Sequence, residues 1–212
     1  MPTSAQHFVI GDSPLWFDLD MPDVAMGVAR TCLAGDPKSM RRTKGRQLAK
    51  LAQERLGLPQ HDIGRGDDGA PVWPLGQGGS FSHWNDLSLC LLSRHTAQDY
   101  GADIEGLADD ASIEAICSEA ITLSERAYVG DRHPLKIDAA LAFSAKESFF
   151  KAAYPRVGHV FGFEALQLVA RPHKGVLQFE LATHLAPELT PGRRVFVQYK
   201  ILESAVVTWT AL

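Results

Sequence analysis

Asp103 and Glu105 are the residues whose types and spacing most directly suggest chemistry. They lie in the segment Gly-Ala-Asp-Ile-Glu at 101–105, which predicts a strand with Ile104 turned toward the core. Alternate residues of a strand project from one face, so the two carboxylates point in the same direction. Carboxylate oxygens are ligands that a hard cation such as Mg²⁺ takes up in proteins. The alternative is an edge strand whose acidic face is simply solvated.

A second group of candidate residues lies on one predicted helix. The sequence Phe-Ser-Ala-Lys-Glu-Ser-Phe-Phe-Lys at 143–151 places Glu147 between Lys146 and Lys151. A further carboxylate for a metal, beside ammonium groups for phosphate, suggests phosphoryl transfer. Glu147 and Lys151 also have the i, i+4 spacing of an ordinary surface ion pair. Lys146 falls on the apolar side of the helix, where a lysine must extend to solvent or find an anionic partner.

A basic segment interrupts an otherwise acidic chain. Between residues 38 and 55 seven cationic side chains oppose one acid, whereas the whole protein has a net charge of −4. Helical spacing places Arg42, Arg46 and Lys50 in one row beside an apolar face. One row of charges on a helix is ordinarily a solvated flank. Here seven cations are balanced by a single acid, which favours an anion-binding surface such as a phosphate site. The seven cations are Lys38, Arg41, Arg42, Lys44, Arg46, Lys50 and Arg55.

The stretch from residue 59 to residue 93 combines a loop with a predicted hairpin. Residues 59–79 are rich in glycine and proline and contain Arg65, which indicates a loop. Residues 80–93 predict two strands joined at Asn85, the second of them fully buried. Ser82 and His83 lie where the first strand meets the turn. A single histidine is more often a structural hydrogen-bonding group than a catalytic one.

The remaining pattern predicts an α+β fold with segregated elements rather than a doubly wound sheet. The strongest helix is 138–154, with Asp138 as its cap and Pro155 as its end. Two shorter helices are expected near 111–121 and 124–129, with Ser112 and Ser124 as N-caps. An early pair of strands is expected at 8–10 and 24–29, and later strands at 163–169, 176–181, 195–199 and 205–210.

Composition bounds the class of protein. The chain has 212 residues, of which 45% are hydrophobic, and no apolar run approaches the ~18 residues of a membrane span. The N-terminus lacks the layout of a signal peptide, so we expect a cytoplasmic protein without a membrane partner. The negative net charge argues against nucleic-acid binding. Cys32, Cys90 and Cys117 are far apart and odd in number, so we expect small buried residues rather than a disulfide or a metal site.

Four motifs together resemble those of the Sfp-type 4′-phosphopantetheinyl transferases, in particular the branch of enterobactin synthase component D. They are the segments 101–105 and 143–151, Pro-Val-Trp-Pro at 71–74 and Gly-Ser-Phe-Ser-His at 79–83, and their order and spacing agree across residues 38–151. The resemblance implies two similar, pseudo-symmetric α+β lobes in one chain. The expected lobes are 1–100 and 101–212, with the active site at their interface.

The resemblance also implies roles for individual residues. The matched metal ligands are Asp103, Glu105 and Glu147, the lysines near the pyrophosphate are Lys146 and Lys151, the coenzyme A contacts are Ser82 and His83, and the basic positions around the 3′-phosphate are Lys38, Arg46 and Arg65. Lysine stands at 38 where the family usually has arginine, and residues 41–43 are Arg-Arg-Thr where it has an aromatic residue. Lysine at 38 gives up bidentate phosphate recognition.

The implied reaction is transfer of 4′-phosphopantetheine from coenzyme A to a serine of an apo acyl or peptidyl carrier protein, with release of adenosine 3′,5′-bisphosphate. The implied metal is Mg²⁺ or Mn²⁺, and the expected enzyme is a monomer. The proton acceptor is Glu147, directly or through a metal-bound water, or Lys146 if burial lowers its pKa. A Mg²⁺-dependent nucleotide phosphohydrolase and a non-catalytic carrier-binding module are the alternatives. The three carboxylates argue against the second, and the pathway of the carrier stays open.

Overall fold

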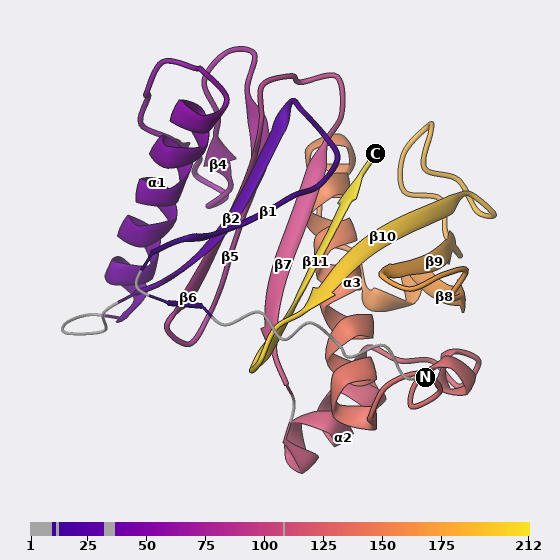
Figure 1. Cartoon of the computed structure of the whole chain (residues 1–212). Helices are drawn as coiled ribbons and strands as arrows, with labels where there is room; N and C mark the ends of the chain where they lie inside the picture. The colour runs from indigo at the N-terminus through magenta and orange to yellow at the C-terminus, as the bar shows by residue number, and fades with distance from the viewer. Residues whose placement is uncertain (1–9, 12, 32–36, 108) are drawn as a thin grey trace.

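The computed structural model describes residues 10–11, 13–31, 37–107 and 109–212, and the side chains of residues 37, 38 and 110 lie outside the description (Figure 1). The first part of the chain forms an antiparallel sheet in the order β1-β2-β6-β5. Its strands are β1 (Leu15–Phe17), β2 (Val24–Arg30), β5 (Gly78–Trp84) and β6 (Leu87–Ser93). The helix α1 (Pro37–Arg55) covers one face of β2 and β6, and the short pair β3 (Gly64–Arg65) and β4 (Pro71–Val72) follows it.

The rest of the chain forms a second antiparallel sheet in the order β7-β11-β10-β9-β8. Its strands are β7 (Tyr100–Gly106), β8 (Leu166–Ala170), β9 (Val176–Leu181), β10 (Arg194–Ile201) and β11 (Ala205–Ala211). The long helix α3 (Leu135–Val157) packs on β7 and β11, and α2 (Asp110–Glu119) packs on α3. Two short 3₁₀ turns, η1 (Glu125–Tyr128) and η2 (Phe163–Ala165), complete this part.

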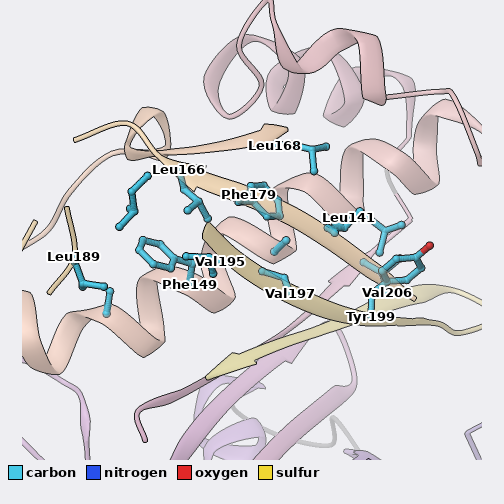
Figure 2. Packing of buried hydrophobic residues seen from close by; sticks show 14 of the residues in the cluster. Leu141, Phe149, Leu166, Leu168, Phe179, Leu189, Val195, Val197, Tyr199 and Val206 are labelled. Carbon is cyan, nitrogen blue, oxygen red and sulfur yellow. The ribbon is translucent and has the colours of Figure 1, made fainter. Parts of the chain in front are cut away.

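The apolar face of α3 meets the second sheet in the largest core of the described residues. Leu141 and Phe149 of the helix pack against Phe179 and Val197 of the central strands, as Figure 2 shows. The helix lies so close to β7 that a Cβ atom at Gly101 would overlap the carbonyl oxygen of Ser148. Glycine therefore allows the close approach that holds α3 over the acidic strand.

The edge strands β5 and β7 lie side by side and connect the two sheets. Ser80 Oγ donates to the carbonyl oxygen of Ala102 across this junction at 3.2 Å. The β5–β6 hairpin turns at Asn85, whose φ of 47° lies in the left-handed region that asparagine tolerates. The hairpin thereby carries the Ser-His motif of β5 up to Asp103 on β7.

The α+β class is confirmed, and several element boundaries differ from the predictions. α3 begins before Asp138 and continues through Pro155 to Val157, although the proline cannot donate a helical hydrogen bond. Asp138 is no cap, because it is buried and accepts from Gly130 N at 2.8 Å and from Arg171 Nη1 at 2.7 Å. The cap of α2 is Asp109 instead of Ser112.

Other predictions have mixed outcomes. Ser124 precedes η1 but makes no side-chain capping bond. The strand expected at 8–10 lies largely outside the described residues, as does Cys32, whereas Cys90 is buried and Cys117 is partly buried. No helix in the described part of the chain is both long and apolar enough to span a bilayer. The division into lobes at residue 100 stays a prediction.

Candidate active site

Asp103 lies at the centre of the site, on the strand between β5 and α3. Its buried carboxylate accepts from Ser82 Oγ on Oδ1 at 2.6 Å and from Ser144 Oγ on Oδ2 at 2.7 Å. The ammonium of Lys151 lies 2.6 Å from Oδ1. Burial acts to raise the pKa of Asp103, but the ammonium and the two hydroxyls outweigh it and hold this pKa below its usual value. Asp103 is therefore an ionised carboxylate that already binds a cation.

The other two predicted ligands, Glu105 on β7 and Glu147 on α3, are partly buried. Burial is the main cause that raises the pKa of both carboxyls, and the charge of Asp103 raises both further. Glu147 adds to the rise in the pKa of Glu105, whereas Lys151 lowers the pKa of each. The three carboxylates are thus near enough to repel one another, and one lysine compensates them only in part.

This donor set fits a hard cation by its chemistry, since all three groups supply oxygen and their mutual repulsion would be relieved by positive charge. Among the described residues, however, no three His, Cys, Asp or Glu side chains are grouped tightly enough to hold a metal ion. The position at Asp103 Oδ1 is taken by the Lys151 ammonium. The metal-binding role of Asp103, Glu105 and Glu147 therefore stays a prediction.

A cavity of about 940 Å³ opens beside Lys151, with walls from α1, the β3–β4 pair, β5 and the second half of α3. Trp73 and Phe81 line it as a stacked pair with ring centroids 5.1 Å apart. The volume is that of a site for a substantial small molecule. Five cationic side chains line the cavity against two acids, so its ligand is expected to be anionic. The cations are Arg41, Arg42, Arg46, Arg65 and Lys151, and the acids are Asp68 and Asp99.

Sequence comparison relates this arrangement to a known family. The family model for the 4′-phosphopantetheinyl transferase N-terminal domain matches residues 41–93, and the model for the 4′-phosphopantetheinyl transferase superfamily matches residues 99–195. The 4′-phosphopantetheinyl transferase Svp of Streptomyces mobaraensis is 33% identical over 190 residues, which cover 85% of this chain and 70% of Svp. The chain belongs to the 4′-phosphopantetheinyl transferase superfamily.

Two further relatives of this superfamily member agree with that assignment. The 4′-phosphopantetheinyl transferase Npt of Nocardia iowensis is 31% identical over 70% of this chain and 66% of its own length. Enterobactin synthase component D of Salmonella typhi is 31% identical over 75% of this chain and 62% of its own length. The chain thus spans slightly less than two thirds of these two relatives. The family and the enzyme class expected from the motifs are confirmed.

Three residues predicted to bind coenzyme A in this superfamily member line the cavity. Ser82, His83 and Lys151 all line it, and Lys151 Nζ donates to Ser82 Oγ at 3.1 Å. Partial burial lowers the pKa of His83, and the charges of Arg41 and Lys151 lower it further. The imidazole is therefore expected to be neutral at neutral pH.

Arg46 and Arg65 also line the cavity, on the side formed by α1 and the β3–β4 pair. Arg46 Nη2 donates to the carbonyl oxygen of Gly64 at 2.9 Å, and its guanidinium lies 4.6 Å from the centroid of the Phe81 ring. Arg65 Nε donates to the carbonyl oxygen of Gly69 at 3.2 Å. Both arginines line the cavity in which an anion is expected. Each of them donates a hydrogen bond to a backbone carbonyl oxygen, which leaves fewer of its N–H groups for a ligand.

The rest of the basic segment is less uniform than its sequence suggests. Lys50, which helical spacing placed in the row of Arg46, pairs with Asp62 at 2.8 Å and is not among the cavity-lining residues. Arg55 stacks over Trp16 with its guanidinium 4.8 Å from the ring centroid. The side chain of Lys38 lies outside the described residues, so its predicted phosphate contact stays a prediction.

Lys146 does not line this cavity and is paired elsewhere, so its predicted contact with the pyrophosphate stays a prediction. The side chain is only 2% exposed, and its ammonium pairs with Glu125 at 2.8 Å. It also donates to the carbonyl oxygens of Ala120 at 2.7 Å and Phe163 at 3.1 Å. Burial lowers the pKa of Lys146 and Glu125 opposes this. Since all three ammonium hydrogens are used, the lysine has no donor left for a substrate.

A set of buried hydroxyls beneath Asp103 was missed by the sequence interpretation. Ser144 Oγ, which donates to Asp103, lies 2.9 Å from Thr208 Oγ1, and Ser148 Oγ lies 2.6 Å from the same Thr208 oxygen. All three side chains are buried. In the sequence the two serines belong to the polar side of a predicted helix. The packing of β11 on α3 shows that this set of hydroxyls holds the Asp103 carboxylate in its orientation.

Proposed function

We propose that this protein transfers the 4′-phosphopantetheine group of coenzyme A to a serine hydroxyl of an apo acyl or peptidyl carrier protein. The observation that carries the proposal is the cationic cavity lined by Lys151, whose ammonium lies 2.6 Å from Asp103 Oδ1. Coenzyme A bears a pyrophosphate and a 3′-phosphate, so its charge complements the excess of cations in the cavity. The relatives Svp and Npt, both 4′-phosphopantetheinyl transferases, support the same reaction.

Lys151 is the residue best placed to meet the pyrophosphate. Its ammonium is partly exposed and lines the cavity, while it stays 2.6 Å from Asp103 Oδ1. Its contact with the carbonyl oxygen of Ala102 is long, at 3.4 Å, so one N–H can turn to a phosphate oxygen at little cost. A fixed ammonium beside the transferred group stabilises charge there, an effect worth ~10²-fold or more in rate.

In the proposed reaction the serine oxygen of the carrier forms a bond to the phosphorus that bears pantetheine. The bond from that phosphorus to the bridging oxygen breaks, and adenosine 3′,5′-bisphosphate leaves with the electron pair. The serine proton passes to the carboxylate of Glu147, directly or through a water. Burial raises the pKa of Glu147, which makes it a better proton acceptor than an ordinary surface carboxylate.

We further propose that Asp103, Glu105 and Glu147 hold Mg²⁺ in the reacting complex. The ion would neutralise pyrophosphate charge, which is the chemistry that magnesium supplies in phosphoryl transfer. Ser82 and Ser144 would keep the Asp103 carboxylate in place, since each donates to a different oxygen. With Mg²⁺ present, a second cation besides Lys151 would compensate these acids.

The proposal is tested by incubating the protein with coenzyme A, Mg²⁺ and a panel of apo acyl and peptidyl carrier proteins. Intact-mass measurement should show one added phosphopantetheine group on at least one carrier. A carrier with alanine at the acceptor serine serves as the control and should gain no mass. Hydrolysis of coenzyme A without any carrier modification would favour the phosphohydrolase and contradict the proposal.

A further inference from the structure

Arg41 is a cavity-lining residue to which neither the motif resemblance nor the helical wheel assigned a role. It lies on α1, is partly buried and faces the cavity together with Arg42, Arg46 and Arg65. Its Nε is shielded from solvent and has no hydrogen-bond partner, and within the described residues its guanidinium forms no ion pair. A shielded N–H without a partner is costly, and an anionic ligand would satisfy it.

The neighbouring arginines are less available to a ligand. Arg46 is committed to the carbonyl oxygen of Gly64, and Arg65 to that of Gly69. Arg42 is exposed, so water screens its charge. Arg41 is therefore the guanidinium of this group whose Nε is shielded from water and, within the described part of the chain, has no hydrogen-bond partner.

The backbone of Arg41 is also held in place. Its carbonyl oxygen accepts from Ser88 Oγ at 3.3 Å, and Ser88 Oγ lies 3.0 Å from Thr31 Oγ1. On the other side Arg41 is near enough to His83 to lower the pKa of that imidazole. The position of Arg41 is thus fixed between the first sheet and the Ser-His part of the cavity wall, as a binding residue requires.

We propose that Arg41 binds the 3′-phosphate of coenzyme A and makes the enzyme select 3′-phosphorylated nucleotides. This inference rests on the proposed function. Arg41 follows Lys38 by three residues of α1, so it belongs to the same side of the helix. Lysine at 38 cannot grip a phosphate with two parallel hydrogen bonds, whereas a guanidinium can. Arg41 would therefore supply the bidentate contact that the lysine at 38 lacks.

The test measures binding rather than turnover. Adenosine 3′,5′-bisphosphate and adenosine 5′-monophosphate, which differ by the 3′-phosphate, are titrated by calorimetry against the wild-type chain and the Arg41→Gln and Arg41→Lys variants. Lys50→Gln is the matched control, because it removes one positive charge from the same helix outside the cavity. Loss of charge-assisted hydrogen bonds is expected to weaken bisphosphate binding about 10- to 100-fold in Arg41→Gln.

The wild-type chain and Lys50→Gln should both prefer the bisphosphate, Arg41→Gln should lose most of that preference, and Arg41→Lys should fall between them. Circular dichroism melts confirm that each variant is folded, and Arg41→Lys still decides the question if Arg41→Gln is not. A preference that survives in both Arg41 variants overturns the inference alone. Absence of bisphosphate binding by the wild-type chain overturns the proposed coenzyme A site and the inference together.

Discussion

Replacing Lys146 by methionine removes an ammonium group from a fully buried set of oxygen atoms. Glu125, its partner, has a side chain that is 1% exposed, and the two charges lie 2.8 Å apart. In the variant Glu125 keeps its hydrogen bonds from Thr122 N at 2.8 Å and Leu168 N at 2.7 Å, but no cation compensates it. Removal of one partner from a buried ion pair costs about 3–5 kcal/mol of unfolding free energy. For a chain of this length that corresponds to a fall of ~6–20 °C in Tm.

The measurement is thermal unfolding followed by circular dichroism, with Lys136→Met as the control. Lys136 lies exposed on the same helix, so its replacement should change the unfolding free energy by less than about 0.5 kcal/mol. The double variant Lys146→Met with Glu125→Gln should recover part of the loss, since it removes the uncompensated charge. A Lys146→Met protein that melts like the wild type while its kcat falls ~10²-fold would refute this reasoning. That result would mean that Lys146 contacts the substrate.

Three further changes test other parts of the site. Glu147→Gln should lower kcat ~10²-fold or more in a carrier-modification assay, with Tm unchanged or raised because a carboxyl with a raised pKa is gone; normal turnover would exclude it as the proton acceptor. Gly101→Ala should cost about 3 kcal/mol or prevent folding, because its Cβ would overlap the Ser148 carbonyl oxygen, and a wild-type melt would disprove that close approach. The raised pKa values of Glu105 and Glu147 mean that their contribution to stability falls as pH rises from the unfolded to the folded pKa. Added Mg²⁺ should therefore raise Tm more at about pH 8 than at about pH 5, and equal shifts would count against these ligands.

The elements around the site were predictable where short-range pattern determines them. The strand expected at 101–105 and the helix expected at 138–154 both appear in the structure, although residues 101–104 are all buried and the strand is therefore covered on both faces. The β5–β6 hairpin followed from two strand patterns separated by Asn85 and one further residue. The end of α3 did not follow, since Pro155 fits within the last turn and the helix continues to Val157.

The partners of the charged residues depend on contacts between distant parts of the chain, which no local pattern contains. The position of Lys146 on the apolar side showed that it needed an anion, but only the packing of η1 on the second sheet identifies Glu125. Similarly, helical spacing groups Lys50 with Arg46, and the loop after α1 then provides Asp62 for the first and Gly64 for the second. Of these two cations, Arg46 lines the cavity and Lys50 does not.

The central claim is that the serine of a carrier protein, and not water, receives the phosphopantetheine group. The most direct measurement compares two products of one reaction: holo carrier, by intact mass, and adenosine 3′,5′-bisphosphate, by liquid chromatography. With coenzyme A, Mg²⁺ and apo carrier the two should form in equal amounts, and neither should form when alanine replaces the acceptor serine. Bisphosphate released in excess of holo carrier, or without any carrier, would contradict the account.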